Sequence, residues 1–308
     1  MTLLPPLLPP FLPAAVLALS GESAANVEYS IDHREGVQGI TVPLRGDVGT
    51  ALSRVAAAAR LPGTWLSTVQ RLIAAMLPNA ILLRIDTDGR RIGALTAYLR
   101  FPQEPAAPVL QALLGATSRL QVRPDAVAAL AQALGCPGAR GIGIRTGVEG
   151  DQRLAVYFRV ERDVHGFDAA ALQQLAGALG WPDDACAPIA RDLRALHPGG
   201  SVGVIGVDVA EDGDIAALKC DPANVPLARA LPFLQQQGAS PERIDACLSL
   251  CRALRARTLS YVGVKYDRSG LAGWRLYFSY RPHGAARNGQ PALLIDTPGT
   301  AALRMPHY

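Results

Sequence analysis

One pattern, a pair of β-strands joined by a tight turn, occurs five times along this chain. Four copies are clear: LLRIDTDGRRIGALTAYLRFP from Leu82, GIGIRTGVEGDQRLAVYFRV from Gly141, GVIGVDVAEDGDIAALKCDP from Gly203 and SYVGVKYDRSGLAGWRLYFSYRP from Ser260. A weaker copy, VEYSIDHREGVQGITVPLR, begins at Val27. Alternating apolar residues on both sides of a turn rich in Gly and Asp predict a β-hairpin. Five units of one type predict a closed or stacked architecture.

The segments between the hairpins change to a helical period of about 3.6 residues. They predict helices over residues 47–60, 64–77, 105–114, 124–134, 168–179, 182–196, 226–237 and 241–257. The repeating unit is therefore strand, strand, helix, helix. Closure of ten antiparallel strands removes exposed sheet edges. We predict an α+β fold, a ten-stranded antiparallel β-barrel of five ββαα units inside a ring of helices, with a central chamber; an open sheet is the alternative.

Composition agrees with one folded domain, which we expect to span residues 1–308. Hydrophobic residues make up 49% of the chain and charged residues 18%, which excludes a disordered chain. The net charge of +4 is too weak and too scattered to indicate a nucleic-acid partner. Of the five cysteines, Cys247 and Cys251 have helical i, i+4 spacing, but no matching His or Cys pair completes a metal site. We interpret the thiols as buried side chains in a reducing cytosol.

The first 25 residues are apolar and rich in proline. No Lys or Arg precedes the apolar run, and its five prolines would break a membrane-spanning helix. We interpret this segment as an arm packed on the domain, and we expect the short Pro-rich tail from Pro291 to close one end of the barrel. A cytoplasmic monomer with no membrane partner is the expectation.

The two faces of each predicted strand differ in chemistry. Ile85, Ile144, Val207 and Val264 belong to the apolar column, which should face the helices. The alternate column, expected to face the chamber, contains Glu28, Ser30, Asp32, Arg84, Asp86, Thr96, Tyr98, Arg100, Gly143, Arg145, Tyr157, Arg159, Gly206, Asp208, Lys219, Gly263, Lys265, Arg275 and Tyr277. The alternatives are reversed faces or charges that meet water. Reversed faces would bury many arginines without partners.

A chamber with this inner wall suits a ligand with several negative charges. Arg binds phosphate oxygens through a bidentate fork, and Lys adds a point charge. The chain has only two lysines, Lys219 and Lys265, against 28 arginines, and both fall on the polar column. Tyrosine rings beside such a cluster could stabilise a carbocation formed when diphosphate leaves. The wall could therefore ionise an allylic diphosphate and shield the cation from water.

These features together resemble the ABBA-type soluble prenyltransferases, the PT-barrel enzymes. The resemblance covers the chain from about Val27 and rests on the ββαα units, the tyrosines on the second strands and the cations beside them. The compact fourth hairpin, GVDVAEDGDIAALKCDP, is similar to that of the small bacterial enzymes, including those that prenylate ribosomally made cyclic peptides. The resemblance implies transfer of a dimethylallyl or geranyl group from its diphosphate, the co-substrate, to an electron-rich acceptor. That acceptor would be a small aromatic or a peptide side chain such as Trp, Tyr or Arg.

The same resemblance implies roles for the individual residues that stand at matching positions of this sequence. The diphosphate would be held by Arg84, Arg145, Arg159, Lys219, Lys265 and Arg275. The tyrosine shield would be Tyr98, Tyr157, Tyr261 and Tyr277. Glu28 would be the base on the acceptor side, with Asp32 as the fallback. Thr96 stands where some members have a lysine, and no aspartate matches a magnesium ligand in GVQGITVP, so no metal ligand is assigned and dependence on Mg²⁺ stays open.

Two other functions compete with prenyl transfer. A non-catalytic barrel that binds an anionic metabolite or lipid would keep the cations but would need no ring of tyrosines. A phosphate-processing enzyme of another fold would need a glycine-rich phosphate loop or paired carboxylates, and the sequence has neither.

His165 and His197 are expected at helix termini. Donor length is open; Gly143, Gly206 and Gly263 could leave room for a longer prenyl chain.

Overall fold

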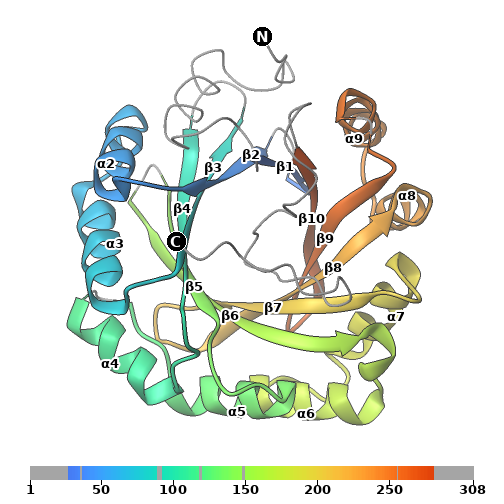
Figure 1. Cartoon of the computed structure of the whole chain (residues 1–308). Coiled ribbons are helices and arrows are strands. Elements are labelled where there is room, and N and C mark those ends of the chain that lie inside the picture. The colour runs from blue at the N-terminus through green and yellow to red at the C-terminus, as the bar shows by residue number, and fades with distance from the viewer. Residues whose placement is uncertain are drawn as a thin grey trace.

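Ten antiparallel strands form a closed barrel in the computed structural model, which describes residues 27–34, 37–88, 92–117, 120–147, 150–254 and 256–280. The arm at residues 1–25 and the tail beyond residue 280 lie outside these ranges. The strands are β1 (Val27–Asp32), β2 (Gln38–Leu44), β3 (Ala80–Thr87), β4 (Ile92–Arg100), β5 (Gly141–Gly147), β6 (Gln152–Asp163), β7 (Ser201–Val209), β8 (Ile215–Pro226), β9 (Thr258–Asp267) and β10 (Gly270–Tyr280). Each strand pairs with its neighbours in sequence, and β1 pairs with β10 to close the ring (Figure 1). Closure confirms the predicted barrel and overturns the open sheet.

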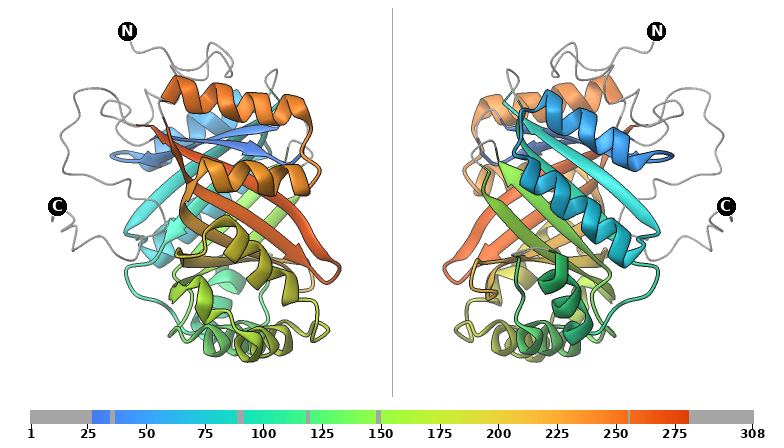
Figure 2. Two further views of the ribbon diagram at one scale, coloured as in Figure 1. Left: turned by 90° about the vertical axis from the view of Figure 1, so that its right-hand side faces the viewer. Right: turned by 90° about the vertical axis from the view of Figure 1, so that its left-hand side faces the viewer.

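Helices surround the barrel in Figure 1, two after each of the first four hairpins. They are α2 (Val48–Ala58), α3 (Gly63–Met76), α4 (Ala107–Thr117), α5 (Pro124–Leu134), α6 (Ala169–Leu179), α7 (Ala187–Leu196), α8 (Leu227–Gln236) and α9 (Pro241–Leu254), with a short 3₁₀ turn, η1 (Val164–Gly166), before α6. The side views in Figure 2 show the helices lying on the outside of the strands. The ββαα repeat is therefore confirmed in each of these four units.

Local chemistry explains where several helices begin and end. The Asp47 side chain accepts a hydrogen bond from the Thr50 amide before α2, and Asp168 caps α6 in the same way. Gly180 ends α6 in the left-handed conformation, with φ of 63°. Three predicted boundaries are wrong by three residues or more. Helix α4 runs to Thr117 rather than ending at residue 114. Residues 183–186 form turns, so α7 begins five residues later than expected, and α9 ends at Leu254 because the Ala256 amide bonds back to the Cys251 carbonyl.

The hydrophobic core lies between the outer face of the barrel and the helices. Ile85, Ile144, Val207 and Val264 are all buried in it, as the alternation predicted. Trp65 on α3 is fully buried and its indole N–H donates to the Ile144 carbonyl of β5 at 3.0 Å. Since the apolar columns face outward to the helices, the reversed-face alternative is wrong, and the polar columns face the interior of the barrel.

Candidate active site

The interior of the barrel holds a cavity of about 390 Å³. Eleven of the residues predicted for the site line it: Glu28, Asp32, Arg84, Tyr98, Arg145, Tyr157, Lys219, Tyr261, Lys265, Arg275 and Tyr277. Arg159 does not line it, although it follows Tyr157 by two residues on β6. The alternation of the strands therefore brings together nearly all of the predicted side chains.

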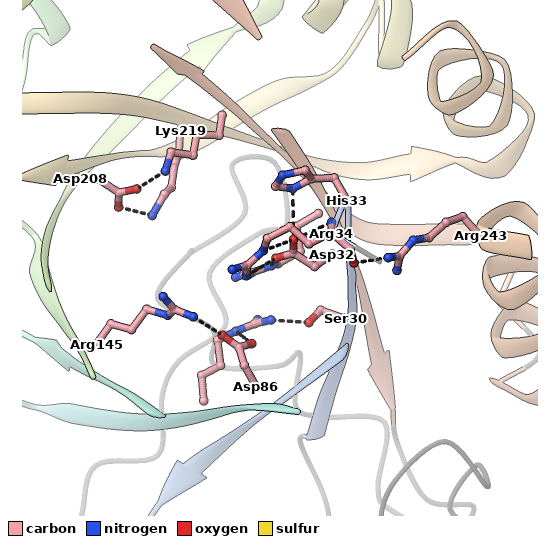
Figure 3. A network of polar contacts seen from close by, with 12 residues as sticks. Ser30, Asp32, His33, Arg34, Asp86, Arg145, Asp208, Lys219 and Arg243 are labelled. Carbon is pink, nitrogen blue, oxygen red and sulfur yellow. Dashed lines mark hydrogen bonds and ion pairs between the residues drawn. The ribbon is translucent and has the colours of Figure 1, made fainter. Parts of the chain in front are cut away.

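The first charge cluster is centred on Arg84, which is 1% exposed. Its Nε donates to Asp86 Oδ1 at 2.8 Å, and its Nη2 donates to Ser30 Oγ at 2.6 Å. Arg145 Nη2 lies 3.6 Å from the other oxygen of Asp86 (Figure 3). Burial would raise the pKa of Asp86, but the guanidinium groups outweigh it and lower that pKa. Asp86 therefore holds two arginines in place at the cavity wall.

The second cluster forms around Asp32, at the hairpin end of β1. Its carboxylate accepts hydrogen bonds from Arg275 Nε at 3.0 Å and Arg34 Nε at 2.9 Å, and His33 Nδ1 lies 3.1 Å away. Burial acts to raise the pKa of Asp32, but Arg275 and Arg34 hold it well below its ordinary value. A carboxylate this strongly held is a poor proton acceptor, so the geometry disfavours Asp32 as the fallback base.

The third cluster joins the two lysines. Lys219 on β8 and Lys265 on β9 are partners in the strand register, and both ammonium groups contact Asp208, with Lys265 Nζ at 2.8 Å from Oδ2 (Figure 3). Burial would raise the pKa of Asp208, but the two lysines lower it to about 2. Placement of Asp86 and Asp208 in the inner column was predicted, whereas their role in clamping pairs of cations was not.

The four tyrosines form two pairs. The rings of Tyr98 and Tyr157 meet edge to face at 5.7 Å between centroids, and those of Tyr261 and Tyr277 do so at 6.4 Å. The Arg84 guanidinium carbon lies 5.7 Å from the Tyr277 centroid. Burial raises the pKa of Tyr157 and of Tyr277, so both hydroxyls stay protonated. The cavity thus presents π-faces next to its cations.

The inner glycines leave the space that neighbouring side chains occupy, so a larger residue at these positions would collide with them. A Cβ on Gly206 would lie 2.8 Å from Cε1 of Tyr157, and one on Gly143 would lie 3.1 Å from Tyr98 and 3.2 Å from Tyr157. A Cβ on Gly263 would meet Asp221 Oδ1 at 2.8 Å and the Tyr277 ring at 3.1 Å. The expectation that these glycines leave room for a longer donor is therefore wrong, because other side chains already fill that space.

Two further carboxylates line the cavity and form no ion pair with a described side chain, although the charges of Arg84 and Arg275 act on both. Glu28 is 6% exposed, and its Oε2 has no hydrogen-bond partner within the part of the chain that the structure describes. Burial raises its pKa to about 8, and the nearby charge of Asp221 adds to the rise. Burial likewise raises the pKa of Asp221 to about 6. The sequence reasoning missed Asp221, although it follows Lys219 by two residues and so belongs to the same inner column.

A larger hollow of about 1200 Å³ adjoins the cavity. Arg153, Leu154, Asp208 and Lys265 line both spaces. The rest of its wall comes mainly from the hairpin ends of β5–β6 and β7–β8 and from α3 and α4. The hollow therefore joins the cavity at the hairpin end of the barrel.

Four other features concern metal binding, the cysteines, the two histidines and the membrane. Within the described ranges, no group of three or more His, Cys, Asp or Glu side chains is placed to hold a metal ion. All five cysteines are free, with Cys247 and Cys251 buried on α9. His165 lies in η1 and His197 caps the end of α7. None of the described helices is both long and apolar enough to span a membrane.

Comparison with known proteins identifies the fold. No family sequence model and no curated protein matches this chain. Among solved structures, 5-dimethylallyltryptophan synthase from Streptomyces coelicolor superposes with a TM-score of 0.59 at 16% identity, over 82% of this chain and 80% of that one. For 6-dimethylallyltryptophan synthase from Micromonospora olivasterospora, in complex with DMASPP and Trp, the TM-score is 0.58 at 16% identity, over 85% and 86%. AnaPT from Neosartorya fischeri gives 0.59 at 12% identity, over 85% and 82%. The chain therefore has the PT-barrel fold of these structures, as predicted.

Proposed function

We propose that this protein is a prenyltransferase that moves a dimethylallyl or geranyl group from its diphosphate to an electron-rich acceptor. One observation carries the proposal: a closed barrel encloses a cavity in which clustered cations lie beside two pairs of tyrosine rings. Two solved structures of the same fold support it, one in complex with DMASPP and Trp and the other, PriB, with L-tryptophan and dimethylallyl thiolodiphosphate.

The donor half of the reaction is assigned to the charge clusters. Arg84, Arg145, Lys219, Lys265 and Arg275 bind the diphosphate oxygens. As the allylic C–O bond breaks, its electron pair passes to the diphosphate, and the cations stabilise the charge that develops there. Arg159 has no part in this assignment, because it does not line the cavity.

The acceptor half is assigned to the tyrosines and Glu28. Tyr98, Tyr157, Tyr261 and Tyr277 hold their rings against the allylic cation and keep water away from it. The acceptor forms its new bond to the cation and loses a proton to Glu28. A pKa near 8 suits that role, since a base works best when its pKa lies near the operating pH.

The size of the acceptor, the cellular location and the single-domain, monomeric organisation are also proposals. The hollow that adjoins the cavity supports an acceptor larger than a free amino acid, such as a peptide that presents one side chain. The free cysteines support a reducing, cytoplasmic location. Organisation of residues 1–308 as a single monomeric domain also stays a prediction.

The direct test is transfer itself. Dimethylallyl and geranyl diphosphate are each incubated with the protein and with tryptophan, tyrosine, arginine derivatives and cyclic peptides, with and without Mg²⁺. We expect one acceptor to gain the mass of a prenyl group in step with the release of diphosphate. Tight binding of both donors without transfer to any acceptor would favour the non-catalytic barrel instead.

A further inference from the structure

His33 lines the cavity and has no role in the proposed reaction. It follows the last residue of β1, so the alternation of that strand does not place it, but its side chain lines the cavity together with Asp32, Arg34 and Arg275. Its backbone amide donates to the Trp274 carbonyl at 2.9 Å, which fixes the end of β1 against β10. In Figure 3 the ring points from the end of β1 toward the interior of the barrel. His33 is therefore part of the cavity wall at the hairpin end.

Three neighbours hold the imidazole in one orientation. Asp32 Oδ1 lies 3.1 Å from Nδ1, and an ionised carboxylate can only accept a hydrogen bond, so Nδ1 carries a proton. The ring lies over Gly273 of β10, where an added Cβ would come within 2.5 Å of Cε1 and 2.9 Å of Nε2. The Trp274 ring packs against it edge to face, at 6.5 Å between centroids. Because Asp32 engages Nδ1, Nε2 is the nitrogen that can meet a ligand.

The surrounding charges set the protonation state of His33 before a donor binds. Burial lowers the pKa of the imidazole below its ordinary value of 6.5, and the positive charges of Arg34 and Arg275 lower it further, whereas Asp32 acts in the opposite direction. Helix α9 brings one more cation to this place, Arg243, whose guanidinium contacts the Arg34 carbonyl (Figure 3). At neutral pH the ring is therefore neutral, with a lone pair on Nε2.

A bound diphosphate would reverse that balance. The three charge clusters line one cavity, so an anion held by Arg145, Lys265 and Arg275 lies against the wall to which His33 belongs. A nearby negative charge favours the imidazolium over the neutral ring. Once protonated, Nε2 can donate a charge-assisted hydrogen bond, which is stronger than a neutral one. A neutral ring would instead turn its lone pair toward the phosphate oxygens.

We propose, building on the prenyltransferase assignment, that His33 is a diphosphate ligand that takes up one proton from solvent as the donor binds. The added proton lies on Nε2 and is donated to a phosphate oxygen, while Nδ1–H stays with Asp32. The side chain is 37% exposed, so the proton can exchange with solvent at the cavity mouth. Since binding consumes a proton, the affinity for the donor increases as pH falls.

The test is calorimetric titration with dimethylallyl thiolodiphosphate and, separately, with inorganic pyrophosphate. His33→Gln keeps a polar side chain but cannot take up a proton. At about pH 6 we expect the variant to bind both probes about tenfold more weakly, equivalent to about 1.4 kcal/mol. At about pH 9, where histidine is neutral, the variant should bind no more weakly than the unmodified protein. Ionisation of the probe is common to both proteins, so the change in their affinity ratio belongs to His33.

A second readout counts protons. Titrations near neutral pH in buffers of different ionisation enthalpy should show a smaller proton uptake in His33→Gln. Gly273→Ala keeps the imidazole but adds the Cβ that would displace it, and it should also reduce the dependence of affinity on pH. His165→Gln, at an exposed position in η1, is the matched control and should behave like the unmodified protein.

The possible failures are distinguishable. An affinity ratio between the unmodified protein and His33→Gln that stays constant with pH, or equal proton uptake by the two, would overturn the role of His33. Pyrophosphate binding that depends on His33, without any binding of the thiolodiphosphate, would overturn the prenyltransferase assignment and keep the anion ligand. No binding of either probe would overturn both.

Discussion

The guanidinium carbon of Arg84 on β3 lies 5.7 Å from the centroid of the Tyr277 ring on β10, although β2 and β1 separate these strands in the barrel. Asp86 and Ser30 hold the guanidinium in that position through Nε and Nη2. The cation proposed to bind the donor and the ring proposed to stabilise the allylic cation are therefore fixed beside each other by the protein alone. Such preorganisation lowers the cost of stabilising charge during the reaction.

Replacement of Arg84 by lysine tests this arrangement. The variant keeps the charge but loses the planar fork that contacts Asp86 and Ser30 together. We expect the affinity for dimethylallyl thiolodiphosphate to fall about tenfold or more, equivalent to about 1.4 kcal/mol, in a calorimetric titration. Arg194→Lys on α7, an exposed position, is the control and should bind like the unmodified protein. Unchanged affinity in Arg84→Lys would show that charge alone matters at this position.

Gly206→Ala tests whether glycine is needed at this position to leave space for the Tyr157 ring. The added Cβ would press on the Tyr157 ring, and overpacking of this kind costs about 1–3 kcal/mol. We expect a lower free energy of unfolding in urea and slower prenyl transfer. Gly177→Ala, at a helical position with open space around it, should be neutral or stabilising. A shift in donor preference at unchanged stability would contradict this view of Gly206.

Glu28→Gln tests the assignment of the base. The amide keeps the shape of the side chain but cannot accept a proton, so we expect kcat to fall about 100-fold or more. Binding of the thiolodiphosphate should persist, because the donor cations are untouched. In the unmodified protein, kcat/KM should rise with pH through a pKa near 8, and the variant should lack that rise. A variant with full activity would exclude Glu28 as the base.

The raised pKa of Glu28 also predicts how stability depends on pH. The folded protein keeps the Glu28 proton up to about pH 8, whereas the unfolded chain loses it above its ordinary pKa of 4.5. The contribution of Glu28 is therefore fully present below that ordinary value and is lost as pH rises toward 8. Thermal melts at several pH values should show Glu28→Gln gaining stability relative to the unmodified protein across this window. A constant difference would mean that Glu28 is ionised in the folded state.

Asp32 should show the opposite dependence of stability on pH, and Asp32→Asn tests this. Arg275 and Arg34 hold the pKa of Asp32 low, so its contribution to stability is present above its ordinary value of 3.8 and is lost as pH falls below it. The variant leaves Arg275 without its buried partner, which typically costs about 3–5 kcal/mol. Urea unfolding at neutral pH should show this loss, and the difference from the unmodified protein should shrink in acid. An unchanged unfolding curve at neutral pH would contradict a structural role for these ion pairs.

The alternation of residues within each hairpin determined which side chains face the cavity. A strand has a side-chain period of two, so once Ile85 and Val264 face the helices, Arg84 and Lys265 must face inward. The repeat of hairpins and helices likewise favoured the barrel over an open sheet, because closure is how such a sheet avoids free edges. These features are local or periodic, and a sequence displays them directly.

Only the tertiary structure decided how the inner side chains pair. Asp32 on β1 meets Arg275 on β10, residues at opposite ends of the chain, because barrel closure sets the register between those two strands. The pairing of β6 with β7 likewise packs the Tyr157 ring against Gly206. The same folded barrel buries Glu28 Oε2 without a hydrogen-bond partner among the described residues. Distances across a barrel depend on the strand register and on how each long side chain packs. The spacing of residues along one strand determines neither of them.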